Sequence, residues 1–194
     1  MKILKYASRT ISLLLIFIHF SCVNEPLEGD FPQDDGVLNI EEGEFRANVG
    51  IGDFSTGLAV GVLSNTDLLT ITGTVPDTGE SIVLTIENPG VGTFNITAGL
   101  GTQNSGVYIE TNPENPFVSD GTFGVFGQLN ITEFDAQNAT VSGTFSFTGV
   151  RVVLDVDGNP VLDSNGQPTV ETEEITNGIF NKIPYTTEDQ GGGG

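Results

Sequence analysis

The sequence contains few of the side chains on which most enzymes depend. It has one cysteine, Cys22, and one histidine, His19, and it has no tryptophan. Residues 23–194 therefore hold neither a thiol nor an imidazole. This excludes a Ser-His-Asp or Cys-His mechanism, the usual zinc sites, haem ligation and blue copper for that part of the chain. Carboxylates remain as the general acids and bases of ordinary pKa.

Positive charge is scarce as well. The chain has 6 Lys and Arg against 26 Asp and Glu, and its formal net charge is −20. Residues 22–194 keep all of the acidic residues but only Arg46, Arg151 and Lys182 of the basic ones, so their net charge is −23. Such a charge excludes electrostatic binding to nucleic acid, which needs a basic face. It also opposes adhesion to anionic membrane surfaces, and it favours solubility and weak attraction of divalent cations.

The N-terminus has the order of a secretory signal peptide. A basic leader at residues 2–9 precedes an almost unbroken apolar run at 11–20, and Ser21 and Cys22 follow. A small residue followed directly by cysteine resembles the lipobox of bacterial lipoproteins, in which the cysteine is acylated and becomes the mature N-terminus. The resemblance implies that Cys22 is lipidated and that the protein is anchored in the outer membrane.

Two alternatives for this segment remain open. A transmembrane helix needs about 20 apolar residues, and the run is only about half as long. An ordinary cleaved signal would leave Cys22 as a lone thiol without a disulfide partner. Acylation gives that thiol a use, because each buried CH₂ contributes about 0.8 kcal/mol and several acyl chains on one residue hold it essentially permanently.

Composition divides the chain into four predicted parts. They are a signal peptide (1–21), a lipidated cysteine with an acidic tether (22–43), a β domain (44–185) and a disordered Gly-rich tail (186–194). The tether is rich in Asp, Glu, Pro and Gly, which is typical of a solvated, self-repelling linker. Acidic residues just after the cysteine also resemble the surface-export signals of Bacteroidota lipoproteins, with a plain spacer as the alternative. The predicted location is the cell envelope, either periplasmic or exposed at the surface.

Apolar residues recur with period two through the predicted β domain, and Thr and Ser often occupy the alternate positions. This pattern indicates half-buried antiparallel strands, and no window shows a helical period over three turns. Short connections favour pairing between sequential strands. The sequence therefore predicts an all-β fold, an antiparallel meander of about nine strands curled into a barrel or a flattened sandwich. The clearest alternations lie at 44–49, 69–75, 81–87, 128–132 and 141–148.

Turn residues predict specific connections. Asp157-Gly158 and Asn165-Gly166 are hairpin signals. Asn177-Gly178 lies within an apolar run, so it predicts either another hairpin or a bulge. In the alternation that starts at residue 141, the inward positions are odd-numbered up to Gly149 and even-numbered from Val150 on. This shift by one residue predicts a β-bulge at Gly149.

Several stretches look like an uncharacterised lipoprotein domain common in Bacteroidota. The resemblance implies a fold and a location, and it transfers no catalytic residue. This chain departs from the pattern by a longer acidic loop at roughly 154–169. The stretches that carry the resemblance are 45–47, 127–132, 142–148, 175–180 and 183–185.

Residues 155–159, DVDGN, resemble the opening of a calcium loop. The spacing of an EF-hand then fails, because Pro160 stands in place of the required glycine and Gly166 stands where the bidentate glutamate belongs. A solvated hairpin is therefore one interpretation, and a weak calcium site is the other. No further cofactor is predicted. The candidate ligands are Asp155, Asp157 and Asp163.

Three hypotheses for function follow. The first is a non-catalytic binding or adhesion module on a lipid tether, with a glycan or a protein as partner and no enzymatic activity. The second is a structural or accessory lipoprotein that docks on an outer-membrane protein. The third is a glycosidase, which needs two facing carboxylates in a cleft. A cavity with polar groups at the mouth of the barrel would favour the first, and a flat exposed apolar patch would favour the second.

Overall fold

The computed structural model describes residues 40–97, 103–111, 115–124 and 126–188. The chain divides between Asp35 and Gly36, and every described residue belongs to the C-terminal part. The predicted signal peptide at 1–21 and the predicted acylation site Cys22 lie outside the described residues. So do most of the predicted tether and the tail from residue 189.

The fold is all-β, as the sequence predicts. The described residues form eleven strands, and their only helical element is the short 3-10 turn η2 (Gly121–Phe123). A helix long and apolar enough to cross a membrane does not occur among them. The strands are β1 (Phe45–Val49), β2 (Gly52–Thr56), β3 (Ala59–Leu63), β4 (Leu68–Thr74), β5 (Ser81–Glu87), β6 (Gly92–Ile96), β7 (Ser105–Ile109), β8 (Phe117–Val118), β9 (Gly127–Asp135), β10 (Thr140–Val152) and β11 (Val170–Thr187).

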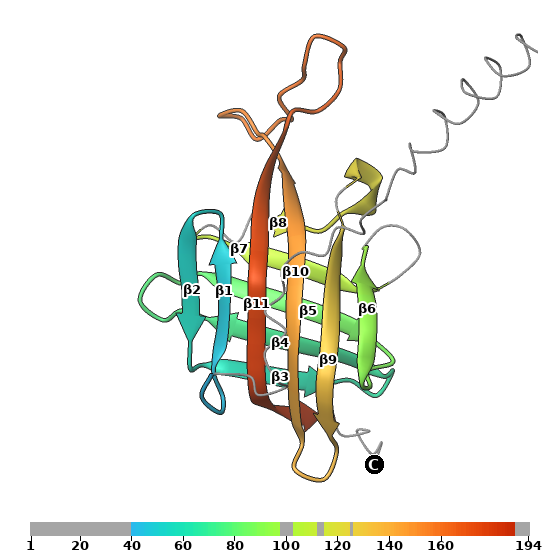
Figure 1. The fold of residues 1–194 in the computed structure, drawn as a ribbon. Helices are drawn as coiled ribbons and strands as arrows, with labels where there is room; N and C mark the ends of the chain where they lie inside the picture. Colours follow the sequence, from blue (N-terminus) through green and yellow to red (C-terminus); the bar gives the residue numbers. More distant parts are fainter. Residues whose placement is uncertain (1–39, 98–102, 112–114, 125, 189–194) are drawn as a thin grey trace, which may run out of the picture. The chain divides into compact units, whose positions relative to one another are not determined.

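The strands form two layers that cross each other. In Figure 1, β2, β1, β11, β10, β9 and β6 run upright in the foreground, and we call this layer the front sheet. Behind it, β3, β4, β5 and β7 cross at a steep angle and form the rear sheet together with the short β8. This arrangement is an orthogonal packing of two sheets, and their inner faces supply the core.

Two connections close the layers into a ring. At one corner, the end of β11 pairs in parallel with β3, so that Tyr185 lies opposite Gly61. At the other corner, Val118 of β8 pairs with Val107 of β7 and with Val150 of β10. The ring runs β11-β3-β4-β5-β7-β8-β10 and returns to β11. The domain is thus intermediate between the barrel and the flattened sandwich that the sequence left open.

Pairing between sequential strands holds only in part. It is found for β1–β2, β3–β4–β5 and β9–β10–β11. In contrast, β6 pairs with β9, and β1 pairs with β11. The eleven strands exceed the predicted count of about nine. A strand as short as β8, with 2 residues, shows no alternation that a sequence pattern could reveal.

Phenylalanines of the front sheet fill one half of the core. The ring centroid of Phe45 lies 5.1 Å from that of Phe145, 5.9 Å from Phe54 and 6.1 Å from Phe180. These separations are those of favourable aromatic pairs. The rear sheet completes the core with aliphatic side chains. The fully buried ones on β4 and β5 are Leu69, Ile71, Ile82, Leu84 and Ile86.

Two glycines let the aromatic ring of a residue on another strand lie directly on their backbone. A Cβ atom at Gly178 would lie 2.6 Å from the ring of Phe145, and one at Gly106 would lie 2.7 Å from the ring of Phe147. Neither distance is possible for a real side chain without movement of the ring. The packing therefore requires glycine at both positions.

Bulges bend the long strand β11. Its register against β10 gains one extra residue near Asn177 and another near Lys182. Both residues have a positive φ, 50° and 47°, which asparagine tolerates better than lysine. Such bulges increase the local twist and bend the strand. Of the two interpretations of Asn177-Gly178, the bulge is confirmed.

The predicted bulge at Gly149 is wrong. The register between β10 and β11 runs without interruption from Phe147 to Val152. Gly149 is buried because it lies directly against Phe117. A Cβ atom added at Gly149 would lie only 2.7 Å from Cβ of Phe117. Val150 is buried next to it because it pairs with Val118. The apparent change of phase in the sequence thus comes from the close approach of β8 rather than from an extra residue.

The β domain continues beyond its predicted end at Tyr185. Thr186 pairs with Val62, and Thr187 pairs with Leu63, in the parallel contact between β11 and β3. The first two residues of the predicted tail at 186–194 are therefore strand. Their pairing with β3 makes them part of the sheet, and the polar composition of the segment does not reveal this pairing.

Candidate functional site

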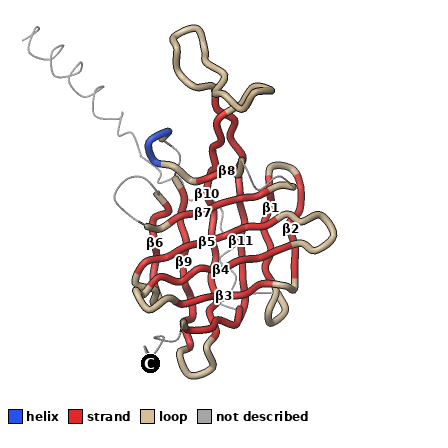
Figure 2. The backbone as a smooth tube through the Cα atoms, turned by 180° about the vertical axis from the view of Figure 1, so that it is seen from behind, coloured by secondary structure: helices blue, strands red, loops and turns tan. Residues whose placement is uncertain are grey.

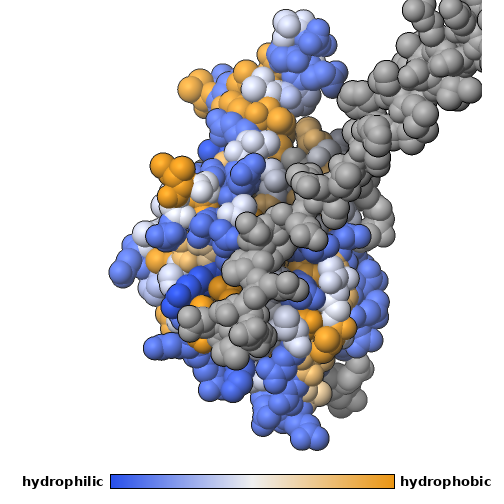
Figure 3. Space-filling model, viewed as in Figure 1, coloured by the Kyte–Doolittle hydropathy of each residue, from blue (hydrophilic) through white to orange (hydrophobic). Residues whose placement is uncertain are grey.

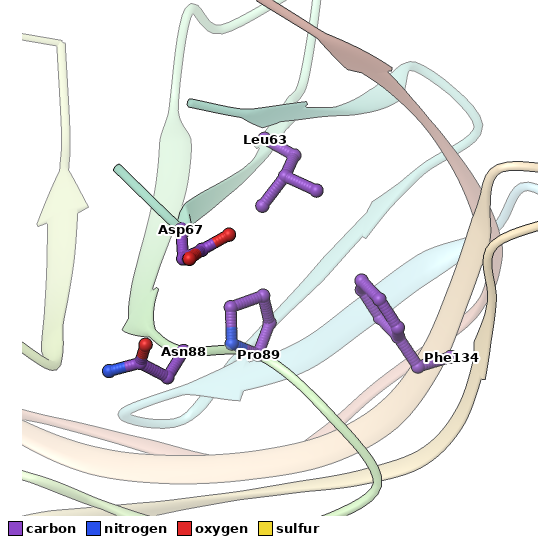
Figure 4. A pocket seen from close by; sticks show the side chains of 5 residues that line it. All are labelled: Leu63, Asp67, Asn88, Pro89 and Phe134. Carbon is purple, nitrogen blue, oxygen red and sulfur yellow. The ribbon is translucent and has the colours of Figure 1, made fainter. Parts of the chain in front are cut away.

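A pocket with a volume of about 280 Å³ opens between the two sheets. Leu63 ends β3, Asp67 lies in the turn before β4, Asn88 and Pro89 follow β5, and Phe134 lies near the end of β9. In Figure 4 the side chains of Leu63, Pro89 and Phe134 converge on one space. The carboxylate of Asp67 extends toward that space, whereas the amide of Asn88 points to the other side. The pocket thus has a mixed lining, in which apolar side chains lie beside a carboxylate.

The two loops that carry Asp67 and Asn88 are tied together through the backbone. The backbone N–H of Asn88 donates to the carbonyl oxygen of Asp67 at 2.7 Å. Both residues have a positive φ, 57° for Asp67 and 51° for Asn88. Aspartate and asparagine adopt this conformation more readily than other non-glycine residues. The local sequence therefore suits two sharp turns that meet at the rim of the pocket.

A stacked aromatic pair fixes the wall formed by Phe134. Its ring centroid lies 5.3 Å from that of Tyr185, and the two rings are inclined by only 8°. Tyr185 is held in turn by its backbone N–H, which donates to the carbonyl oxygen of Ala139 at 2.9 Å. Burial, followed by the negative charge of Asp135, raises the pKa of the Tyr185 hydroxyl. The Tyr185 hydroxyl is therefore neutral at physiological pH, and the ring of Phe134 that stacks on it lines the pocket.

The lining residues of the pocket offer both apolar contact and hydrogen-bonding groups. Within the described part of the chain, the side chains of Asp67 and Asn88 make no hydrogen bond. The carboxylate of Asp67 can accept hydrogen bonds from hydroxyl groups, while Phe134 and Pro89 offer apolar contact. Convergent apolar walls with a few polar groups are typical of ligand sites. Asp67 is the one carboxylate among the described residues that line this pocket.

The predicted calcium ligands lie in a different region, at the tip of the β10–β11 hairpin. Residues 153–169, here called the double turn, project beyond the two sheets (Figure 1). Asp155 and Asp163 lie in two successive turns, closed by the bridges Leu154–Pro160 and Leu162–Pro168. Both predicted hairpins, at Asp157-Gly158 and Asn165-Gly166, are thus confirmed. Among the described residues, no three Asp, Glu, His or Cys side chains gather closely enough to hold a metal ion.

Each turn uses its first aspartate in the same way. Oδ1 of Asp155 accepts from the backbone N–H groups of Asp157 and Asn159, both at 2.9 Å. Oδ1 of Asp163 accepts from Asn165 at 2.8 Å and from Gln167 at 2.9 Å. These backbone hydrogen bonds lower the pKa of both aspartates. The two carboxylates therefore stabilise the turns, and the weak calcium site stays a prediction.

The double turn contains a short repeat that the interpretation as a calcium loop overlooked. The residues LDVDGNP at 154–160 recur as LDSNGQP at 162–168. The matching Leu, Asp, Gly and Pro positions explain why the two turns have the same hydrogen bonds. Val156 is fully exposed, and Leu162 keeps 57% of its surface exposed. Figure 3 shows apolar residues on this projection.

The pocket itself could not be found from sequence patterns. Its described lining comes from three separate segments of the chain, at 63–67, 88–89 and 134, and Asn88-Pro89 has only the signature of a turn. Phe134 lies out of phase with Leu129 and Ile131, because β9 has one extra residue between Ile131 and Glu133 opposite β10. A signal was present in the paired Asp67 and Asn88, since both residue types favour a positive φ, but their proximity depends on the fold.

The all-β domain with its pocket can be compared with known proteins. The chain belongs to the family described as "Domain of unknown function (DUF6252)", which matches residues 36–184. A search of the curated proteins found no match, and neither did a search of the solved structures. The matched range includes all of the strands except the last residues of β11.

Proposed function

We propose that this chain is a lipid-anchored outer-membrane lipoprotein of a Bacteroidota bacterium and that its β domain is a non-catalytic binding or adhesion module. The pocket formed by Leu63, Asp67, Asn88, Pro89 and Phe134 is the observation that carries the binding function. The anchor rests on the sequence, in which a basic leader, an apolar run and Ser21-Cys22 follow one another.

The order of the segments supports an anchored module. The predicted tether follows Cys22, and the strands begin at Phe45. Fully extended, the 21 residues from 23 to 43 could reach about 70 Å. A chain with a net charge of −23 would gain little from an anionic membrane surface, so the acyl chains would supply the attachment. The tether would hold the β domain away from that surface.

The chemistry of the pocket favours a neutral sugar as the ligand. A sugar ring has an apolar face that can lie on an aromatic side chain, and it has hydroxyl groups that can donate to a carboxylate. Phe134 and Asp67 supply these two kinds of contact. A glycosidase would need a second carboxylate at a suitable distance, and among the described residues the pocket lining contains Asp67 alone. A non-catalytic role fits this lining better than hydrolysis.

Ligand-observed NMR on the purified protein tests the binding function. The probes are glucose, galactose and N-acetylglucosamine at millimolar concentration. At least one of them should show saturation transfer from the protein, and Phe134→Ala and Asp67→Asn should each abolish it. Phe94→Ala and Asp77→Asn are matched controls, since Phe94 also packs against the core and Asp77 lies in another exposed turn.

Two results would contradict the proposed site. One is an absence of transfer for all three sugars in the wild-type protein. The other is a signal that persists unchanged in both pocket variants, because the sugar would then bind elsewhere. Melting temperatures of the four variants show whether the fold is intact in each.

The second candidate function is an accessory lipoprotein that docks on an outer-membrane protein. Its support is the double turn, which projects from the domain and exposes Val156 and Leu162. In this case Val156→Ser with Leu162→Ser should reduce co-purification with an outer-membrane protein while leaving any sugar signal unchanged. Co-purification that is equal in the double variant and the wild type would exclude the double turn as the contact.

A further inference from the structure

The outer face of the rear sheet differs from the rest of this acidic protein. Figure 2 shows the domain from behind, with β3, β4, β5 and β7 toward the viewer. Outward side chains on these strands carry no charge except for Glu87 at the last position of β5. We call the remaining set the uncharged face. It consists of Val60, Val62, Leu68, Thr70, Thr72, Thr74, Ser81, Val83, Thr85, Ser105, Val107 and Ile109.

The strand registers arrange these side chains in rows across the sheet. Val60 lies opposite Thr72, which lies opposite Val83, and Val83 lies opposite Val107. A second row runs through Thr70 and its partners on β3, β5 and β7. β-Branched residues in register form a regular surface whose methyl groups can pack against a second sheet.

The margin of this face on β3 is distinctly apolar. Leu58, just before β3, keeps 63% of its surface exposed, and Val60 and Val62 keep 57% and 38%. The three residues occupy alternate positions, so they point in the same direction. Contiguous exposed apolar side chains are typical of interaction sites.

The outer side of the front sheet, in contrast, carries exposed charged side chains. Arg46 and Asp53 are exposed there, as are Glu133 on β9 and Glu174 on β11. In a chain with 26 acidic and 6 basic residues, any contact between two copies through such a surface would bring carboxylates together. Like charges facing each other cost several kcal/mol in an interface.

We propose that the uncharged face is a contact surface between two copies of this chain, which meet with their rear sheets facing each other. In that arrangement the exposed carboxylates of both front sheets lie away from the contact, and Glu87 lies at its edge, at the last position of β5. Salt at physiological strength screens exposed charges beyond about 8 Å, so the remaining repulsion between the outer sides is small. The threonine hydroxyls can pair across the interface, and the valines can pack as between two stacked sheets, which lie about 10 Å apart.

The size of the face sets the expected strength of the contact. Four strands at about 4.8 Å, each about six residues long at about 3.3 Å, cover roughly 20 Å by 20 Å. A standard interface buries about 800 Å² of accessible surface on each partner, and this face is smaller. The dimer should therefore be weak and reversible. Anchoring in one membrane would raise the local concentration of the copies. For this increase in concentration, the inference rests on the lipid anchor of the proposed function.

Cysteine cross-linking in cells tests the proposal on the full chain. Cys22 is the one natural cysteine, and its acylated form has no thiol, so an introduced cysteine is the reporter. Thr72→Cys and, separately, its neighbour Val83→Cys place a thiol near the middle of the uncharged face. Thr144→Cys is the matched control, since Thr144 is also a half-buried outward threonine but lies in β10 of the front sheet.

Mild oxidation followed by a non-reducing gel should give a covalent dimer for Thr72→Cys or Val83→Cys and at least fivefold less for Thr144→Cys. Adding Val60→Glu should reduce the dimer severalfold, because it places like charges on the face. The absence of a dimer from both rear-sheet variants, or equal dimer from the control, would overturn the proposal. A dimer of the wild-type chain would instead show that Cys22 carries a free thiol, which would contradict the anchor and not the contact surface.

Discussion

The guanidinium of Arg151 lies on the ring of Phe117, with its central carbon 4.1 Å from the ring centroid. The same group forms ion pairs with Glu110 at 2.7 Å and with Glu171 at 2.8 Å. Arg151 belongs to β10, Glu171 to β11 of the same sheet, and Glu110 follows β7 of the rear sheet. One side chain thus connects the two sheets at the corner that β8 closes.

Replacing Arg151 should therefore weaken the domain. Arg151→Met keeps the length of the side chain but removes the charge, the ion pairs and the cation–π contact. Partly exposed ion pairs contribute up to about 1 kcal/mol, and a cation–π contact contributes about 0.5–1 kcal/mol. We expect a loss of about 1–2 kcal/mol in the free energy of unfolding, measured by urea denaturation. Lys182→Met is the control, because the Lys182–Glu42 pair is longer, at 3.3 Å, and more exposed. Equal losses in both variants would show that the corner has no special role.

The aromatic contact at Gly178 predicts a clear effect of a single methyl group. Gly178→Ala would place Cβ 2.6 Å from the ring of Phe145, so the ring must move. Overpacking of this kind typically costs about 1–3 kcal/mol. Gly90→Ala is the matched control, because no atom lies within 4 Å of the added Cβ there. Thermal unfolding of both variants checks this, and a Gly178→Ala protein as stable as the Gly90→Ala protein would contradict the packing.

The ionisation of Tyr108 should show whether the domain stays folded at alkaline pH. Tyr108 is 4% exposed, and its hydroxyl donates to Oε1 of Glu80 at 3.1 Å. Burial, followed by the negative charge of Glu80, raises the pKa of Tyr108 well above its usual value of about 10. Because the pKa is raised in the folded state, this group stabilises the fold fully below pH 10 and less as the pH rises further.

Ultraviolet titration of the phenolate absorbance measures this directly, since the chain has no tryptophan. Tyr108 should ionise only well above pH 10, together with loss of the β-sheet signal in circular dichroism. Glu80→Gln should shift its ionisation toward the ordinary pKa, because the negative charge is removed while burial remains. Ionisation of Tyr108 near pH 10 in the intact fold would contradict the buried position.

Salt should stabilise this acidic protein by screening. The net charge of −20 imposes self-repulsion on the compact state, and sodium chloride should therefore raise the melting temperature modestly. Calcium at the same ionic strength tests the predicted site at Asp155, Asp157 and Asp163. A further rise would require binding to the native state alone. Because Oδ1 of Asp155 and of Asp163 already accept backbone hydrogen bonds, we expect at most a small additional effect, removed by Asp155→Asn. An additional rise that survives this substitution would place the ion elsewhere.

The sequence predicted the parts of the fold that depend on neighbouring residues. The alternations at 69–75 and 81–87 correspond to β4 and β5, and those at 128–132 and 141–148 correspond to β9 and β10. These strands are half buried in a regular way, so the pattern of apolar residues is sufficient. The hairpins of the double turn were likewise predicted by their Asp-Gly and Asn-Gly pairs.

The closure of the sheets could not be predicted, because it depends on residues that meet only in the fold. The parallel contact of Tyr185 with Gly61 joins segments more than a hundred positions apart. The sequence pattern at Gly149 was interpreted as a bulge. A glycine that lies directly against another residue, here Phe117, gives the same pattern. The pocket has the same limitation, since Leu63 and Phe134 come together through that closure.

The most direct test of the proposed function is the state of Cys22. Expressed in a Bacteroidota host, the wild-type chain should partition into the detergent phase, and mass spectrometry of its N-terminal peptide should find an acylated Cys22. Cys22→Ser removes the thiol that acylation needs, so this variant should be soluble or remain unprocessed. A Cys22→Ser protein that still partitions with membranes like the wild type would contradict the lipid anchor.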